Sequence, residues 1–134
     1  MILLNVFLVN LVSAENIKMN EPDEKLTKFL ELNKETWKVW EANGVSSETE
    51  LTVDFNFYAS SEGAYKALSA ELKDSGISYR EKTTRTLFIL KGWEITASIT
   101  QKWSLATIQG KTGYMYILSK QTNTVYEGLG ALMP

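Results

Sequence analysis

The chain has 134 residues, 44% of them hydrophobic, which is enough for one domain with a hydrophobic core. Its net charge of −2 gives no overall attraction to nucleic acid or to anionic membranes. Cysteine and histidine are absent, which excludes disulfides, thiolate chemistry, zinc sites of the usual type and catalysis by imidazole.

The charge is unevenly distributed along the chain. Residues 1–59 carry five lysines against ten acidic residues, a net charge of −5, whereas residues 60–134 carry nine basic and six acidic residues, a net charge of +3. A solvated acidic helix face explains this pattern, and a surface that binds a basic protein is the alternative.

The first 14 residues, MILLNVFLVNLVSA, form an apolar run that is too short and too polar to span a bilayer. Three interpretations stay open: a cleaved export signal, an extension upstream of a true start at Met19, and an ordered strand or helix. Residues 1–22 are thus an N-terminal extension or a signal segment. The expected localisation is cytoplasmic, or periplasmic if residues 1–14 are a cleaved signal.

A helix is predicted over residues 23–43. Pro22 and Asp23 are typical of a first helical turn, and Gly44 is typical of the residue that ends a helix. Apolar residues recur on one face, which predicts that Trp37 and Trp40 belong to the core. The opposite face carries charged side chains, among them the acidic residues Glu31, Glu35 and Glu41.

The next segment alternates apolar and polar residues over 50–58, as expected of a strand with one buried face. Ser60 or Ser61 can cap a following helix, which Gly76 would close. Residues 77–82 are short and charged, which is typical of an edge strand.

A turn is predicted at residues 83–85, followed by the best alternating strand of the chain at residues 87–103. Gly92 inside this strand predicts a bulge or kink. Ser104 can cap a further helix that runs to about Thr122. A short strand at residues 123–129 and a tail at residues 130–134 complete the chain.

This order, a helix followed by β-α-β-β-α-β, predicts an α+β fold for one domain over residues 23–134. Right-handed crossovers give a ferredoxin-like, four-stranded antiparallel sheet in the order 4-1-3-2, with the two later helices on the same face. The strand at residues 87–103 becomes a central strand. The extra N-terminal helix is expected to cover an edge or an end of the core.

Four segments resemble the family of the regulator of ribonuclease E activity B. They are KLTKFLELNKETWKVWEANG, DFNFYASSEGAYKALSAELKDSGISY, GWEITASITQKW and the closing NTVYEGLGALMP, in which Tyr126, Glu127 and Gly128 match the tyrosine–acid–glycine ending of the family. The family's usual aspartate is Glu127 here, and its usual tryptophan is Leu129. The resemblance implies a ferredoxin-like, non-enzymatic protein without a cofactor that binds and inhibits another protein, a ribonuclease.

Toxin neutralisation, RNA binding and acid–base catalysis are the alternative functions. Small acidic domains also serve as immunity proteins that neutralise a bacterial toxin, and such a partner would also present a basic face. Ferredoxin-like sheets can bind RNA through exposed aromatics, for which Tyr58 and Phe88 are candidates, but carboxylates beside them repel phosphate. Asp54 with Glu94 is a candidate acid–base pair, although no nucleophile accompanies it.

The sequence therefore predicts a protein-binding surface with neither catalytic nor metal-binding residues. Its oligomeric state is left open. The interface candidates are Glu31, Glu35, Glu41, Asp54, Glu94, Tyr126 and Glu127.

Overall fold

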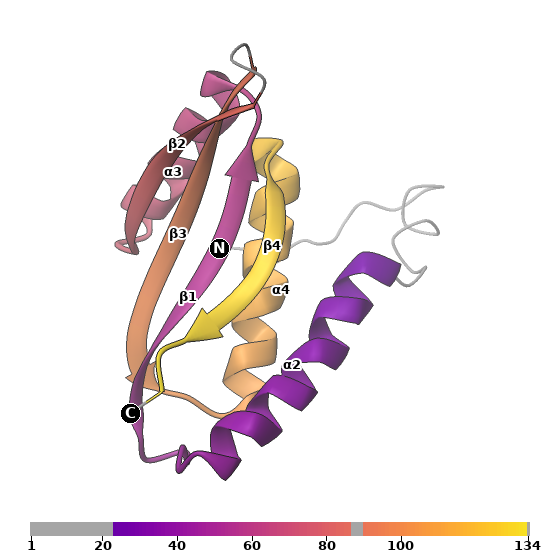
Figure 1. Ribbon diagram of the computed structural model, residues 1–134, viewed down its shortest axis with the longest axis vertical. Coiled ribbons are helices and arrows are strands. Elements are labelled where there is room, and N and C mark those ends of the chain that lie inside the picture. The colour runs from indigo at the N-terminus through magenta and orange to yellow at the C-terminus, as the bar shows by residue number, and fades with distance from the viewer. Residues whose placement is uncertain (1–22, 87–89, 134) are drawn as a thin grey trace.

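The computed structural model describes residues 23–86 and 90–133, which form three helices and four strands (Figure 1). In chain order these are α2 (Glu24–Ala42), β1 (Glu50–Ala59), α3 (Glu62–Asp74), β2 (Ser78–Thr86), β3 (Leu90–Lys102), α4 (Leu105–Thr122) and β4 (Val125–Ala131). This arrangement confirms the predicted α+β fold with an additional N-terminal helix.

The helices begin where polar side chains bind their free amides. The Asp23 carboxylate accepts hydrogen bonds from Lys25 N–H and Leu26 N–H at the start of α2. Ser61 accepts from Ala64 N–H at the start of α3, and Ser104 forms a capping box with Thr107 at the start of α4. Each cap satisfies donors that have no partner within the helix.

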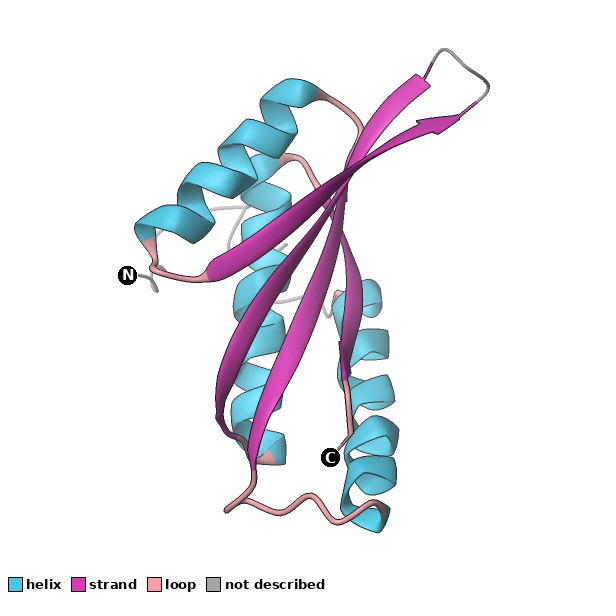
Figure 2. Ribbon diagram, turned by 60° about the vertical axis from the view of Figure 1, so that its left-hand side comes forward, coloured by secondary structure: helices cyan, strands magenta, loops and turns pink. Residues whose placement is uncertain are grey.

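The strands form one antiparallel sheet in the order β2-β3-β1-β4, which confirms the predicted order 4-1-3-2. β3 is central and pairs with both β1 and β2. Helices α3 and α4 lie on the same face, behind the sheet in Figure 1, and α2 crosses α4 (Figures 1 and 2). The opposite face carries no helix of the described chain.

The core lies between the sheet and the helices. Phe55 and Phe57 of β1 and Ile95 of β3 are almost fully buried there, together with Trp103 after β3. Both tryptophans of α2 are buried as well, which confirms that they belong to the core.

Helix α2 is attached to α4 by buried hydrogen bonds and to β4 by an aromatic contact. Asn33 Nδ2 donates hydrogen bonds to Thr112 Oγ1 at 2.9 Å and to Gln109 Oε1 at 2.8 Å. Phe29 packs edge-on against Tyr126 of β4 at 4.8 Å between ring centroids. These contacts place α2 beside α4 and the edge strand β4, which agrees with the predicted cover over an edge or an end of the core.

The start of α2 is fixed at Asp23 by the Tyr116 hydroxyl, which donates to both oxygens of the Asp23 carboxylate at 2.9 Å. Partial burial raises the pKa of Asp23. The hydrogen bonds from Leu26 N–H and Tyr116 and the charge of Lys120 outweigh this effect, so the pKa lies below its usual value. The carboxylate therefore stays ionised down to lower pH in the folded state.

Three local predictions are wrong. β2 continues through Thr86, so the turn is not at residues 83–85, because residues 83–86 pair with β3. Gly130 and Ala131 belong to β4 rather than to a tail, because they pair with Asp54 and Val53.

The bulge predicted as one possibility at Gly92 is the third wrong prediction, since the β2–β3 register passes through this residue without a shift. The glycine instead makes room for the Tyr58 ring, which a Cβ at position 92 would overlap. The register does shift between β1 and β4, where Glu127 is an extra residue between the pairs Asn56–Gly128 and Phe57–Tyr126. Gly128 has a φ of +108°, a conformation that favours glycine.

Several predictions lie outside the described residues. They concern the segment at residues 1–22 and the first part of the predicted strand, residues 87–89, including Phe88. Within the described chain, no helix has both the length and the apolar character needed to cross a membrane.

Candidate functional site

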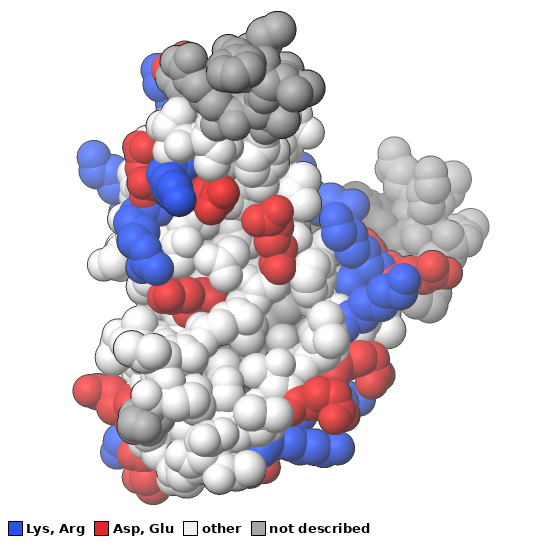
Figure 3. All heavy atoms as spheres, in the orientation of Figure 1, with Lys and Arg blue, Asp and Glu red and all other residues white. Residues whose placement is uncertain are grey.

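The face of the sheet that carries no helix is the candidate site, and we call it the open sheet face. It is formed by the side chains that alternate with the core residues: Thr52, Asp54, Asn56 and Tyr58 of β1, Glu94, Thr96, Ser98 and Thr100 of β3, and Ser78, Arg80 and Lys82 of β2. Figure 3 looks onto this face and shows charged groups scattered over its upper half and a broad uncharged area in its lower half.

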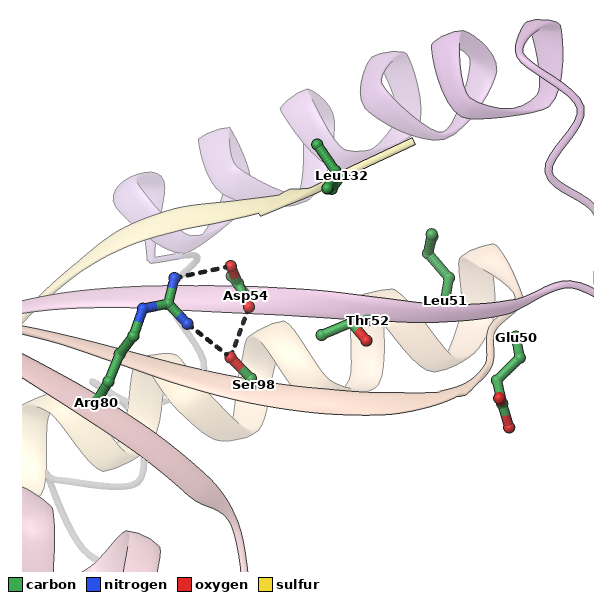
Figure 4. Close-up of a pocket in the computed structure, with 7 residues that line it drawn as sticks. All are labelled: Glu50, Leu51, Thr52, Asp54, Arg80, Ser98 and Leu132. Atoms are coloured by element: carbon green, nitrogen blue, oxygen red, sulfur yellow. Dashed lines mark hydrogen bonds and ion pairs between the residues drawn. The ribbon is translucent and has the colours of Figure 1, made fainter. Parts of the chain in front are cut away.

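Hydrogen bonds between strands hold these side chains in place. The Ser98 hydroxyl donates to Asp54 Oδ1 at 2.6 Å, and Arg80 Nη2 forms an ion pair with Asp54 Oδ2 at 3.2 Å. The Arg80 guanidinium also donates to Ser98 Oγ at 3.3 Å, which closes a triangle of side chains from three strands (Figure 4). The result is a fixed pattern of donors and acceptors on an exposed surface.

The same pattern extends along the β1–β3 pair. Thr52 and Thr100 hydroxyls lie 2.6 Å apart, and Thr96 Oγ1 donates to Asn56 Oδ1 at 3.0 Å. Direct cross-strand pairs of this kind are expected to stabilise a sheet modestly. Here they also restrict the rotamers of side chains that face solvent, which lowers the entropy cost of binding a partner.

A shallow hollow of about 430 Å³ lies on this face beside the triangle. It is lined by Glu50, Leu51, Thr52, Asp54, Arg80, Ser98 and Leu132 (Figure 4). Leu132 is the residue after the end of β4, and it is 91% exposed. Leu132 and Thr52 thus give the hollow an apolar and a hydroxyl side next to its charged groups.

The seven interface candidates from the sequence do not form one site. Glu31, Glu35 and Glu41 lie on exposed positions of α2, where Glu31 pairs with Lys34 and Glu35 with Lys38, each at 3.5 Å. These ion pairs are exposed, so they contribute little stability.

Asp54 and Glu94 both lie on the open sheet face, but not together. Asp54 is opposite Ser98, whereas Glu94 is opposite Tyr58 and Lys82, four residues before Ser98 in β3. At roughly 3.3 Å per residue this separates the two positions by about 13 Å. The two carboxylates therefore cannot share a proton, and the geometry gives the acid–base hypothesis no support.

The closing motif is divided between core and surface. Glu127 is exposed at the bulge of β4, but Tyr126 is only 2% exposed and packs against Phe57 with 5.5 Å between ring centroids. Burial raises the pKa of the Tyr126 phenol well above its usual value. Tyr126 is thus a core residue that no partner can reach without unfolding.

Arg80, Ser98, Thr52 and Leu132 are the site residues that the sequence did not identify. Ser98 follows from the strand alternation once its register with Asp54 is known, but alternation alone does not give that register. Leu132 was assigned to a tail and does follow β4, but β4 ends two residues later than predicted, which brings Leu132 next to the sheet. Among the described residues, no group of three or more acidic side chains could hold a metal ion.

The fold and the site together define a small α+β domain of ferredoxin-like topology, in which no helix of the described residues covers one face of the sheet. The sequence model of the family described as Regulator of ribonuclease activity B matches residues 30–131. The chain therefore belongs to this family, which is a family of regulators and not a known family of enzymes. No curated protein matches the chain.

Proposed function

We propose that this protein binds a ribonuclease and inhibits it through the open sheet face. The family match supports a regulator of ribonuclease activity. The observation that carries the choice of surface is the interstrand network around Asp54, because it fixes polar side chains on the face of the sheet opposite the helices. Such a pre-organised surface suits recognition of a folded or extended protein partner.

The other hypotheses gain no comparable support. Of the two aromatics considered for stacking RNA bases, Tyr58 lies over Gly92 and is half-buried, and Glu94, directly opposite it on β3, is acidic. No observation favours a toxin over a ribonuclease as the partner. A cytoplasmic ribonuclease regulator is accordingly the function we propose.

The proposal is tested with a purified endoribonuclease from the source organism. We expect the wild-type protein to form a complex and to slow cleavage of an RNA substrate. Because the chain has no cysteine, Thr52→Cys can carry a photo-crosslinker on the open sheet face, with Ala106→Cys on α4 as the matched control. A protein that neither binds nor slows the ribonuclease would contradict the function, whereas crosslinking from Ala106→Cys alone would contradict the surface.

The exposed acidic residues of α2 are proposed to steer a basic partner toward the complex. Glu31→Lys combined with Glu35→Lys should lower the association rate at low salt, with little effect on folding because both side chains are exposed. Stopped-flow mixing at two ionic strengths measures this. An association rate equal to that of wild type at low salt would remove α2 from the proposal.

A further inference from the structure

A free strand edge lies next to the open sheet face. β3 pairs with β1 as far as Lys102, but its pairing with β2 ends at the pair Ser78–Ser98. The last four residues of β3, Ile99–Lys102, thus have a strand on only one side among the described residues. Figure 1 shows β3 continuing well beyond the point where β2 begins.

β2 begins only at Ser78 because the backbone amides just before it are hydrogen-bonded to α3. Gly76 N–H donates to Lys73 O at 3.0 Å, and Ile77 N–H donates to Leu72 O at 2.9 Å, so both amides belong to the end of α3. Gly76 also has a φ of +71°, which turns the chain away from the strand direction. The described part of the fold therefore places no strand at the edge of Ile99–Lys102.

A hollow of about 450 Å³ runs beside this edge, and we call it the notch. It is lined by Gly76, Ile77, Ser78, Ser98, Ile99, Thr100 and Lys111. Ile77 and Ile99 are only half-buried and give the notch an apolar floor. Ser98 lines both the notch and the hollow at Asp54, so the two lie next to each other.

Lys111 supplies the charge of the notch. Its Nζ lies 5.2 Å from the centroid of the Tyr114 ring, and it forms no ion pair with any described residue. Tyr114 is in turn joined to the end of α3 through Ser75, with 3.2 Å between the two hydroxyl oxygens. The cation is thus held at the notch without an acidic partner.

We propose that the notch binds an extended segment of a protein partner, which adds to β3 as a short strand beside Ile99–Lys102. Backbone N–H and C=O groups at a strand edge are satisfied by another extended chain, as in other proteins that bind peptides by strand addition. Side chains opposite Ile99 and Gln101 point to the helix side of the sheet. The bound segment therefore carries an apolar residue over Ile77 and Ile99 and, two residues away, an acidic residue that pairs with Lys111.

This inference rests on the proposed function only for the identity of the partner, the ribonuclease. The first test is hydrogen–deuterium exchange of the protein with and without the ribonuclease. We expect slower exchange of amides within Ile99–Lys102 in the complex, because strand addition engages backbone groups directly. The edge of β4, Val125–Ala131, serves as the internal control and should be unchanged.

The second test compares Lys111→Glu with the matched control Lys66→Glu, an exposed position on α3. Reversal at the notch should weaken the complex by roughly three- to tenfold, since an exposed ion pair is replaced by repulsion, and the control should bind as wild type does. A complex without protection of Ile99–Lys102 and with equal affinity for Lys111→Glu would overturn the notch while leaving the proposed function intact.

If the ribonuclease does not bind at all, the proposed function fails and the notch is tested with peptides. The blocked peptide Thr-Val-Thr-Asp-Thr should protect the amides of Ile99–Lys102, and its counterpart Thr-Val-Thr-Lys-Thr should not. Protection by neither peptide overturns the inference. Protection that rises with protein concentration in the absence of any partner also overturns it, because a second copy then occupies the edge. Protection that disappears on removal of residues 1–22 overturns it as well, because the chain's own N-terminal segment then occupies the edge.

Discussion

The two faces of the sheet are built from alternate residues of the same strands, yet they differ in every other respect. On the helix side, Phe55 and Ala97 are completely buried and touch other apolar groups. On the open side, their neighbours Asp54 and Ser98 bind each other and Arg80 across strands. Adjacent positions in the chain thus alternate between packing in the core and polar contacts at the surface, and substitutions on the two faces should have different consequences.

Trp93→Ala tests the helix-side face and should have the largest effect. Trp93 is 9% exposed, and its ring stacks on that of Tyr65 with 5.6 Å between centroids. Truncation of a large buried ring leaves a cavity and should lower the free energy of unfolding by about 3–5 kcal/mol. Urea denaturation measures the loss, with Thr100→Ala on the open side of the same strand as the control. A midpoint equal to that of wild type would place Trp93 on the surface.

Asn33→Ala tests whether polar contacts on the helix side also contribute to stability. The substitution leaves the buried Thr112 hydroxyl and the Gln109 amide without their donor. The expected loss is about 1–3 kcal/mol, the usual cost of unpaired buried polar groups. Thermal unfolding followed by tryptophan fluorescence, to which Trp37 and Trp40 of α2 contribute together with the two tryptophans elsewhere in the core, measures the loss. The exposed neighbour Lys34→Ala should change stability by less than about 0.5 kcal/mol, and an equal loss in both variants would refute the role of the network.

Gly92→Ala tests a tightly packed position on the open side. The added Cβ would overlap the end of the Tyr58 ring, so the ring must move away from the backbone that it covers. We expect a loss of about 1–2 kcal/mol, which is typical of local overpacking. The double variant with Tyr58→Ser should remove this penalty, and a double-mutant cycle by urea denaturation gives the coupling. Purely additive losses would show that Tyr58 and Gly92 do not interact.

The difference between the two faces also explains which features of the fold can be predicted from the sequence. Period-two alternation identifies which residues of β1 and β3 face the helices, since burial of one face is the dominant requirement on a strand. Serine caps and glycine C-caps mark the helix ends well, because those residues satisfy local backbone geometry at Ser61, Gly76 and Ser104.

Features that depend on contacts distant in sequence are not predicted. The role of Gly92 depends on Tyr58, which lies 34 positions earlier, and Tyr126 is buried because α2 and β1 pack around it. The triangle of Asp54, Arg80 and Ser98 depends on the register of three strands. The notch depends on the residue at which β2 begins. Neither register nor strand length is fixed by local alternation.

Asp54→Asn tests the open side itself and should have the smallest effect on stability. An asparagine can still accept the hydrogen bond from Ser98, and the lost ion pair with Arg80 is largely exposed, with 67% of the arginine side chain accessible. The free energy of unfolding should therefore change by less than about 1 kcal/mol. If the open sheet face binds the ribonuclease, the same substitution should weaken the complex several-fold, because Asp54 orients both Arg80 and Ser98. Calorimetric titration and urea denaturation of the same sample separate the two quantities. A large loss of stability with unchanged affinity would reverse the assignment of the two faces.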